Sequence, residues 1–431
     1  MSAGPVSFTG AAQILRPPRD GLDHLRGADL AGQTLAPGGL TVAGGVITAL
    51  EPEPRAELTI DAHGCAIVPG FIDCHTHLPF AGWRAREYEQ KVGGVAYAEI
   101  ALAGGGIASS AQALCESSDE QVLAQSRGLA TEMLAAGTTT FECKSGYGLS
   151  REQELRALRL ARQLEAEVAQ TTVSTALLAH AVPSGYTADG WMDEVERMLP
   201  EVLAPGCVSA LDIFVESVAF SNANLQRMGE LAAAAGLALR CHVEQFGGHR
   251  SVPVALAAGA RSVDHLCTLH PQDVEPLAQA DCAAVLLPAA EFLGAEQRAP
   301  GRALLEAGAI VVLATDANPG TAPVVSMPLV IGLAVRLYGM STLETLAAAT
   351  LNAAWTLGMQ TERGSIEVGK QADLVLLDAP AEHVAYRLGH NPVQMAFIAG
   401  EPVYVRDERA AARLSRRSGP GDEDRAMRTG R

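Results

Sequence analysis

Eight short apolar runs recur along the middle of the chain, and the segments between them carry helical patterns. The runs cover residues 71–77, 138–144, 171–180, 210–216, 237–244, 261–266, 283–290 and 310–317. Runs that are apolar throughout are typical of parallel strands that helices cover on both faces. Eight strand–helix units within about 250 residues predict a (β/α)8 barrel of the TIM type, an α/β fold.

The two ends of the chain have a different texture. Short apolar runs punctuated by glycine occupy residues 1–68 and return in 362–410, a pattern typical of small antiparallel strands and turns. We therefore expect one small β-sandwich domain built from both chain ends, with the barrel over residues 69–361. Residues 411–431 are rich in arginine and contain a Gly-Pro-Gly break, which predicts a flexible tail. Residues 85–137 are longer than one crossover needs, and we expect them to cover the barrel mouth.

Composition and charge exclude several classes of partner. With a net charge of −17, the chain is not expected to bind nucleic acid, because such binding depends on a basic surface. No apolar stretch reaches the roughly 18 residues of a membrane span, and the first residues lack the pattern of a secretion signal, so we expect neither a membrane anchor nor secretion. The eight cysteines form no close-spaced framework and several lie inside apolar runs, which fits a reducing compartment. We expect a cytoplasmic protein that acts on a small molecule.

Most of the apolar runs end in a polar residue. These residues are His77, Lys144, His180, Glu216, His242, His265 and Asp316. In a barrel of this kind the carboxyl ends of all strands lie on one face, and that face carries the active site. Side chains that are far apart in the sequence are therefore expected to meet in one cavity.

A metal site is the strongest interpretation of this face. His75 and His77 occupy alternate positions of the first run, so both side chains point to one side of the strand. His242 on the fifth run and Asp316 on the eighth complete a set of three nitrogen atoms and one oxygen atom. Such a set suits one Zn2+ or Fe2+ ion with an open position for water. Each residue alone has an ordinary structural explanation, but their coincidence at strand ends favours a metal site.

Other residues at strand ends have two interpretations each. Lys144 is either a structural polar residue or a bridging ligand for a second metal ion, whereas the position of His180 favours contact with a substrate. The segment TDANPGTAP contains Asn318, Gly320 and Thr321. It is either a Pro-Gly turn after the last strand or a loop whose backbone and side chains hold an anion or an amide.

A set of motifs narrows the function. HTHLPFAGWR, AGGGI, GTTTFECKSGYGL, AHAVP, HVEQ, DHL and ATDANPGTAP occur in this order and resemble the imidazolonepropionase family of the amidohydrolase superfamily. The resemblance implies hydrolysis of 4-imidazolone-5-propanoate to N-formimino-L-glutamate in histidine degradation, at a mononuclear Zn2+ or Fe2+ centre. Position by position, it implies metal binding by His75, His77, His242 and Asp316. It also implies substrate contacts by Arg84, Tyr147, His180, Gln245, Asn318, Gly320 and Thr321. A homodimer is common for such enzymes, and we expect one here.

The resemblance also implies a mechanism. Opening the ring needs a hydroxide at neutral pH, and a divalent cation lowers the pKa of a bound water from about 16 to roughly 7–9. We expect Asp316 to take the proton of that water and pass it to the departing ring nitrogen. His265 is expected to orient the water or stabilise the oxyanion, and Gln245 to hold the N–C–N edge of the ring.

Arg84 is expected to bind the propionate of the substrate, because a guanidinium recognises a carboxylate through two parallel hydrogen bonds. The alternative is a surface salt bridge with Glu87 or Glu89.

Two positions depart from the family pattern, namely Trp83 before Arg84 and Glu291 after the seventh strand. An acid that faces the cavity would repel a carboxylate, so Glu291 bears on the choice of substrate.

Two other functions fit parts of the sequence. A deaminase or cyclic-amide hydrolase acting on another heterocycle would need an additional acid, which Glu244 or Glu291 could supply. A catalytically silent metal-binding or scaffold protein is the second alternative, and the complete ligand set argues against it.

Overall fold

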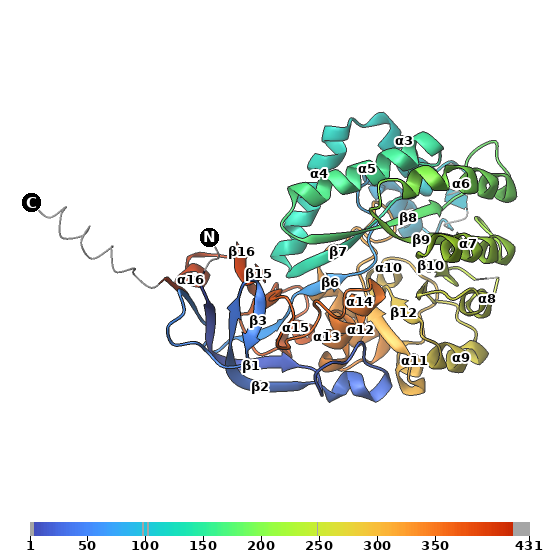
Figure 1. Cartoon of the computed structure of the whole chain (residues 1–431). Helices are drawn as coiled ribbons and strands as arrows, with labels where there is room; N and C mark the ends of the chain where they lie inside the picture. Colours follow the sequence, from blue (N-terminus) through green and yellow to red (C-terminus); the bar gives the residue numbers. More distant parts are fainter. Residues whose placement is uncertain (1–3, 97–98, 101–102, 248, 417–431) are drawn as a thin grey trace, which may run out of the picture.

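The larger part of the structure is a barrel of parallel strands with helices around it (Figure 1). The computed structural model describes residues 4–96, 99–100, 103–247 and 249–416. Within these residues the strands are β6 (Phe71–Asp73), β7 (Thr138–Lys144), β8 (Thr171–Ala179), β9 (Val208–Val215), β10 (Ala238–Val243), β11 (Ser262–His265), β12 (Ala283–Leu286) and β13 (Ile310–Leu313). They pair in parallel and in sequence order, and seven helix-containing connections join them. The predicted eight-stranded barrel is confirmed.

The barrel closes just beyond the ends of its first and last strands. There Asp316 N–H donates to His75 O (3.0 Å), and His77 N–H donates to Ala317 O (2.9 Å). Thr76 and Ala317 form a parallel bridge. The closure therefore places the two predicted halves of the metal site beside each other.

Helices cover the outside of the barrel. Those between the strands and after β13 are α4 (Asp119–Ala135), α5 (Arg151–Glu167), α6 (Ala188–Leu203), α7 (Asn222–Ala235), α8 (Val252–Ala257), η2 (Pro271–Asp273), α9 (Val274–Gln279), α11 (Gly301–Ala307), α12 (Met327–Tyr338), α13 (Thr342–Ala348) and α14 (Leu351–Thr356). Ser118, Ser221 and Ser341 begin three of them with capping boxes, which satisfy free backbone N–H groups at the helix start. The apolar faces of the helices pack on the strands and form the main hydrophobic core.

Shorter helices lie over the mouth. They are α1 (Ala85–Val92), α3 (Ile107–Glu116) and α10 (Pro288–Phe292). The first two belong to the segment 85–137 that we expected to cover the mouth, and Ile107 at the start of α3 lines the cavity there. The described part of the chain contains no helix long and apolar enough to cross a membrane.

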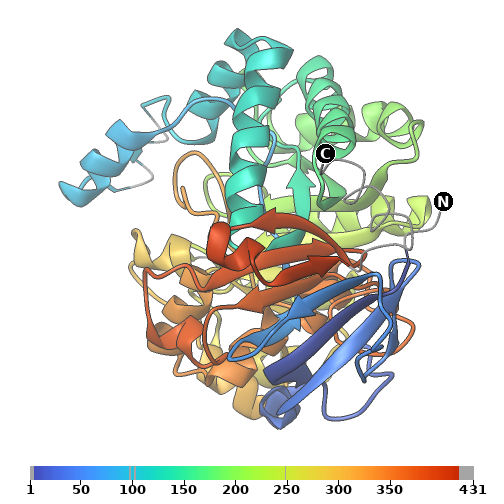
Figure 2. The same cartoon turned by 90° about the vertical axis from the view of Figure 1, so that its left-hand side faces the viewer.

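Strands from both chain ends form the second sheet (Figure 2). It contains β1 (Val6–Arg16), β2 (Thr34–Ala43), β3 (Val46–Ala49), β4 (Leu58–Asp61), β5 (Ala66–Pro69), β14 (Leu374–Leu377), β15 (Val393–Ile398), β16 (Glu401–Val405) and β17 (Leu414–Arg416), while η1 (Gly27–Gly32), α15 (His383–Tyr386) and α16 (Glu408–Ala411) lie between strands. The predicted β domain from both ends is present, as one mixed nine-stranded sheet rather than two facing antiparallel sheets. Phe8 and Phe397 meet edge to face in its apolar core, with ring centroids 4.9 Å apart.

The residue bounds that we assign to the domains stay a prediction. One difference lies in the segment expected to be a flexible tail, where β17 pairs antiparallel with β4. The rest of that predicted tail, residues 417–431, lies outside the described residues.

Candidate active site and metal centre

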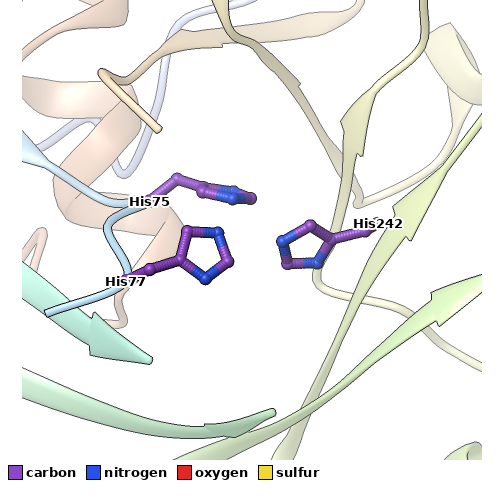
Figure 3. A group of neighbouring side chains, drawn as sticks. All are labelled: His75, His77 and His242. Atoms are coloured by element: carbon purple, nitrogen blue, oxygen red, sulfur yellow. The ribbon is translucent and has the colours of Figure 1, made fainter. Parts of the chain in front are cut away.

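Three histidine side chains converge at the barrel mouth (Figure 3). His75 and His77 follow β6, and His242 comes from β10 on the opposite wall. One nitrogen from each ring lies within 4.8 Å of the others, and all three side chains are buried. The structure thus brings together the three histidines that the sequence predicted as ligands.

Asp316 completes this group. Its Oδ1 lies 3.5 Å from His75 Nε2 and 3.2 Å from His77 Nε2. Among the described residues, His75 Nε2, His242 Nε2 and Asp316 Oδ2 are buried without a hydrogen-bond partner. Buried polar atoms without partners are costly, and a divalent cation would satisfy all of them at once. The donor set therefore fits a metal ion.

The ionisation of these groups suits a cation as well. Burial lowers the pKa of His77 to about 4 and also lowers the pKa of His242, so these two rings are neutral and offer lone pairs. Burial and Lys144 oppose the charge of His75, but hydrogen bonds with Asp264 and Asp316 raise its pKa to about 9, so this ring would release a proton on binding a cation. Burial opposes ionisation of Asp316, yet hydrogen bonds with His75 and His77 hold the pKa of its carboxyl well below the usual range. Neutral imidazoles and a carboxylate are the ligand forms that Zn2+ and Fe2+ take.

Two aspartates that the sequence analysis missed orient the histidines. His75 Nδ1 donates to Asp264 Oδ2 (2.6 Å), and His242 Nδ1 donates to Asp212 Oδ1 (3.0 Å). Each bond holds a proton on Nδ1, so that Nε2 is the nitrogen that can bind a metal ion. The sequence does contain a sign of these two aspartates, because each is a charged residue inside an otherwise apolar strand. Charged side chains are rarely buried in this way without a partner.

Backbone conformation also directs site residues into the cavity. Asp316 and His265 have φ angles of 57° and 82°, in the left-handed region that residues other than glycine seldom adopt. Such a conformation costs about 1–3 kcal/mol and persists only where the surroundings enforce it. Here the barrel-closing hydrogen bond to His75 O holds Asp316 in place.

A small cavity opens above the histidines. Its lining residues are His77, Arg84, Ile107, Tyr147, His180, Phe214, His242, Gln245, Phe246, His265, Asp316, Asn318 and Thr321. All the predicted site residues are among them except His75, which is fully buried beneath, and Gly320. The sequence analysis missed the apolar wall of Ile107, Phe214 and Phe246, because nothing distinguishes these residues from core residues in a linear sequence.

Arg84 reaches this cavity with unused donors. Its side chain is buried, and its Nε and Nη1 have no hydrogen-bond partner among the described residues. The predicted alternative partner, Glu87, forms an ion pair with Nε at 3.7 Å, and its carboxylate also accepts the N–H of Gly106. The guanidinium fits because residue 320 is a glycine. A Cβ on Gly320 would come within 1.8 Å of Arg84 Nη2.

His180 and Tyr147 form the adjoining wall. His180 stacks on His77 with ring centroids 5.1 Å apart, and its Nδ1 donates to Gly146 O (3.1 Å). Burial holds the pKa of His180 well below its ordinary value, so its Nε2 is a free acceptor. The loop that carries Tyr147 is fixed by Glu154, whose carboxylate accepts the N–H groups of Gly146 (2.9 Å) and Gly148 (2.7 Å).

The loop that carries Gln245 is fixed in the same way. Glu216 at the end of β9 is buried, and its Oε1 accepts the N–H groups of Gln245 (2.7 Å) and Phe246 (2.9 Å). A carboxylate that accepts consecutive backbone N–H groups holds the loop in one conformation. Glu216 therefore acts on the cavity through Gln245.

The Asn318 loop has the form of a turn, which is one of the two interpretations that the sequence left open. In the other interpretation its backbone and side chains would hold an anion or an amide. Instead, Asn318 Oδ1 accepts the N–H groups of Gly320 (2.9 Å), Thr321 (2.7 Å) and Ala322 (3.3 Å). Asn318 Nδ2 donates to Asp316 O (2.6 Å), so this tight turn supports Asp316.

Lys144 does not have the form of a bridging metal ligand. Its Nζ lies 2.6 Å from Asp212 Oδ2 and 3.0 Å from Glu142 Oε2, inside the barrel. Burial and Arg240 oppose the charge, but Asp212 and Glu142 raise the pKa of Lys144. A protonated amine has no lone pair for a metal, so the structural interpretation of Lys144 holds.

The residues that raised doubt about the substrate lie away from the cavity. Glu291 accepts a hydrogen bond from Tyr338 OH (2.7 Å), and Glu244 accepts the N–H of Val252 (3.1 Å). Trp83 is half exposed and packs edge to face on Phe80 outside the cavity. Neither acid can repel a substrate carboxylate directly, nor serve as the additional acid of a deaminase.

The fold and this site together define a metal-dependent hydrolase. The sequence pattern of the amidohydrolase family matches residues 66–403. A protein of Rubrobacter xylanophilus named imidazolonepropionase is 44% identical over 384 residues, which are 86% of this chain and 92% of that protein. One of Herpetosiphon aurantiacus with the same name is 41% identical over 401 residues, covering 88% of this chain and 93% of that protein.

A solved structure shares the fold. It is an adenosine deaminase from Xanthomonas campestris with bound zinc, with a TM-score of 0.69 and 19% identity, and the match covers 94% of this chain and 96% of that one. At this identity the likeness concerns the fold alone. The chain belongs to the amidohydrolase family and, within it, to the imidazolonepropionases.

Glu291 generates a testable prediction about stability. Burial raises the pKa of this carboxyl from 4.5 to about 7, so the folded protein binds the proton more tightly than the unfolded chain. The resulting stabilisation is complete at low pH and is lost as the pH rises through about 7. The loss approaches roughly 3 kcal/mol, at about 1.4 kcal/mol per pKa unit.

We expect Glu291→Gln to unfold at a higher temperature than the unaltered protein at pH 8, with little or no such gain at pH 5. The amide can still accept the Tyr338 hydrogen bond. Thermal unfolding at both pH values measures this, with Glu296→Gln at an exposed position as the control. An equal pH dependence of the two variants would contradict the prediction.

Proposed function

We propose that the protein hydrolyses 4-imidazolone-5-propanoate to N-formimino-L-glutamate, a step of histidine degradation. The observation that carries the proposal is the buried guanidinium of Arg84, which lines the same cavity as the metal-binding group and whose Nε and Nη1 have no hydrogen-bond partner among the described residues. Of the described residues that line the cavity, Arg84 alone carries a fixed positive charge. A small ring that bears a carboxylate meets both requirements.

His75, His77, His242 and Asp316 would hold one Zn2+ or Fe2+ ion, and the same donor set serves both metals. When bound, the ion lowers the pKa of a water so that hydroxide forms near neutral pH, and it polarises the ring carbonyl. We propose Asp316 as the base, since its carboxylate lies at the site in ionised form. Asp316 takes the proton of the attacking water and delivers it to the ring nitrogen as the C–N bond breaks.

The remaining side chains hold the substrate. Arg84 binds the propionate through parallel hydrogen bonds, and Tyr147 and His180 add polar contacts on the adjoining wall. Gln245 pairs with the N–C–N edge of the ring, for which a neutral amide offers one donor and one acceptor. His265, beside His242, stabilises the oxyanion or orients the water.

The apolar side chains complete this arrangement. Phe214, Phe246 and Ile107 line the cavity without offering competing charges. They can pack against the flat faces of the ring and exclude water from the reacting atoms. A neutral heterocycle with an anionic tail suits a cavity with apolar walls and one arginine.

We also infer a cytoplasmic homodimer. All eight cysteines lie in the described part of the chain and none forms a disulfide there, which supports a reducing compartment. The dimer rests on the resemblance to related enzymes.

The proposed function is tested by incubating metal-loaded protein with 4-imidazolone-5-propanoate. We expect loss of the ring absorbance and formation of N-formimino-L-glutamate without release of ammonia. Asp316→Asn protein, which keeps the size of the side chain, is expected to lose turnover. Ammonia release from another heterocycle, with no reaction on the imidazolone, would favour the deaminase alternative.

Arg84 gives a sharper prediction about specificity. Arg84→Ala should lower kcat/KM mainly through a higher KM, because a charge-assisted hydrogen bond contributes about 1.5–3 kcal/mol. Arg86→Ala, at an exposed position two residues later, should leave both constants unchanged. The propionamide analogue of the substrate should be turned over equally by Arg84→Ala and unaltered protein. An unchanged KM for the natural substrate would remove Arg84 from the binding site.

A further inference from the structure

The two aspartates behind the metal-binding histidines are connected to each other through the interior of the barrel. Asp264 Oδ2 lies 3.2 Å from Arg240 Nη2, and Arg240 Nη1 donates to Glu142 Oε1 (2.5 Å). Glu142 Oε2 lies 3.0 Å from Lys144 Nζ, which donates to Asp212 Oδ2 (2.6 Å). We refer to these five side chains, Asp264, Arg240, Glu142, Lys144 and Asp212, as the buried ion chain.

The buried ion chain begins at one metal-binding histidine and ends at another. Asp264 accepts from His75, and Asp212 accepts from His242. Every one of its side chains is at most 1% exposed, so solvent does not screen these charges. A change at any link is therefore transmitted to the next as a change in a strong, directional contact.

Lys144 is the link that touches both halves of the metal site. Its side chain holds Asp212, which orients His242. Its backbone N–H donates to Thr76 O (3.1 Å), between the other two histidines. Asp212 Oδ1 is already used by His242 and by Ile213 N–H (2.7 Å), while Oδ2 bonds to Lys144. Without the ammonium, Asp212 loses the contact that sets the rotation of its carboxylate.

Lys144 also contributes to the balance of charge around the metal site. The buried ion chain contains three carboxylates and two cations, and Asp316 adds a fourth carboxylate. With His75 neutral as a metal ligand, negative charges outnumber positive charges by two among these groups, and a divalent cation between the histidines would balance them. Buried charges are tolerated only when they are paired, so the described charges favour binding of an ion with a charge of two.

We propose that Lys144 is a positioning residue for the metal centre: it fixes Asp212, and through Asp212 the ring of His242, in the orientation that binds the ion. This inference rests on the metal site of the proposed function. It concerns metal binding alone and does not depend on the identity of the substrate.

The test is the affinity of the apoprotein for Zn2+, measured by competition with a chromophoric chelator at fixed pH. Lys144→Met keeps the length of the side chain and removes its charge. We expect it to weaken Zn2+ binding by about 10–100-fold, the range typical of residues that orient metal ligands. Bound Co2+ provides a second readout, because a rotated His242 changes the visible absorption of the ion.

Lys370→Met is the matched control. Lys370 is also a buried lysine with an ion pair, to Glu367 (3.0 Å), but it lies in the segment before β14, in the β domain. Its replacement should lower the thermal midpoint without changing the Zn2+ affinity. If Lys144→Met folds and its Zn2+ affinity stays within about twofold of the unaltered protein, the proposal is overturned.

A double variant tests whether weakened Zn2+ binding comes from the lost anchor of Asp212 or from the changed net charge. Glu142→Gln with Lys144→Met removes one anion and one cation, so the buried charge is unchanged and the fold is better tolerated. Because Asp212 still lacks its anchor, we expect Zn2+ binding to remain weakened and the Co2+ spectrum to remain altered. Return of both to the values of the unaltered protein would show that only net charge matters and would overturn the proposal.

Inactivity of the unaltered protein on the imidazolone would leave these outcomes unaffected and would refute the proposed function alone.

Discussion

Backbone hydrogen bonds between residues 75–77 and 316–317 close the barrel, and the rest of the site depends on this closure. They bring the two histidines that follow β6 against the aspartate that follows β13, although more than half of the chain separates them. The same contacts hold Asp316 in its left-handed conformation, which turns its carboxylate toward the histidines. Closure of the barrel and assembly of the donor set are thus one structural event.

Buried polar side chains hold the loops around the metal-binding residues in place. Glu154, Glu216 and Asn318 each accept several backbone N–H groups from one loop, and each loop carries a residue of the cavity. Beneath them, the buried ion chain orients two of the ligating histidines. A reaction that needs hydroxide, ring and carboxylate within one small cavity depends on such preorganisation.

The sequence was sufficient to predict the barrel and the grouping of His75, His77 and His242 at its mouth, because both follow from periodic features. Apolar runs mark the strands, and polar residues at strand ends face one cavity in this fold. The alternation of His75 and His77 became informative only together with His242 and Asp316 at the ends of other strands. Asp212, Asp264 and Arg240 were not recognisable, since their pairing depends on register between neighbouring strands. The sequence left open whether the Asn318 segment is a turn or a loop that binds an anion or an amide. The structure shows its backbone amides engaged, because one side-chain oxygen reaches all three.

The central claim is that one divalent cation completes a buried site built from His75, His77, His242 and Asp316. Titration of metal-free protein with Zn2+ tests it most directly, with bound metal and turnover of 4-imidazolone-5-propanoate followed together. We expect both to saturate at one equivalent per chain and a second equivalent to add nothing. Full turnover by metal-free protein, or saturation only at two equivalents, would contradict it.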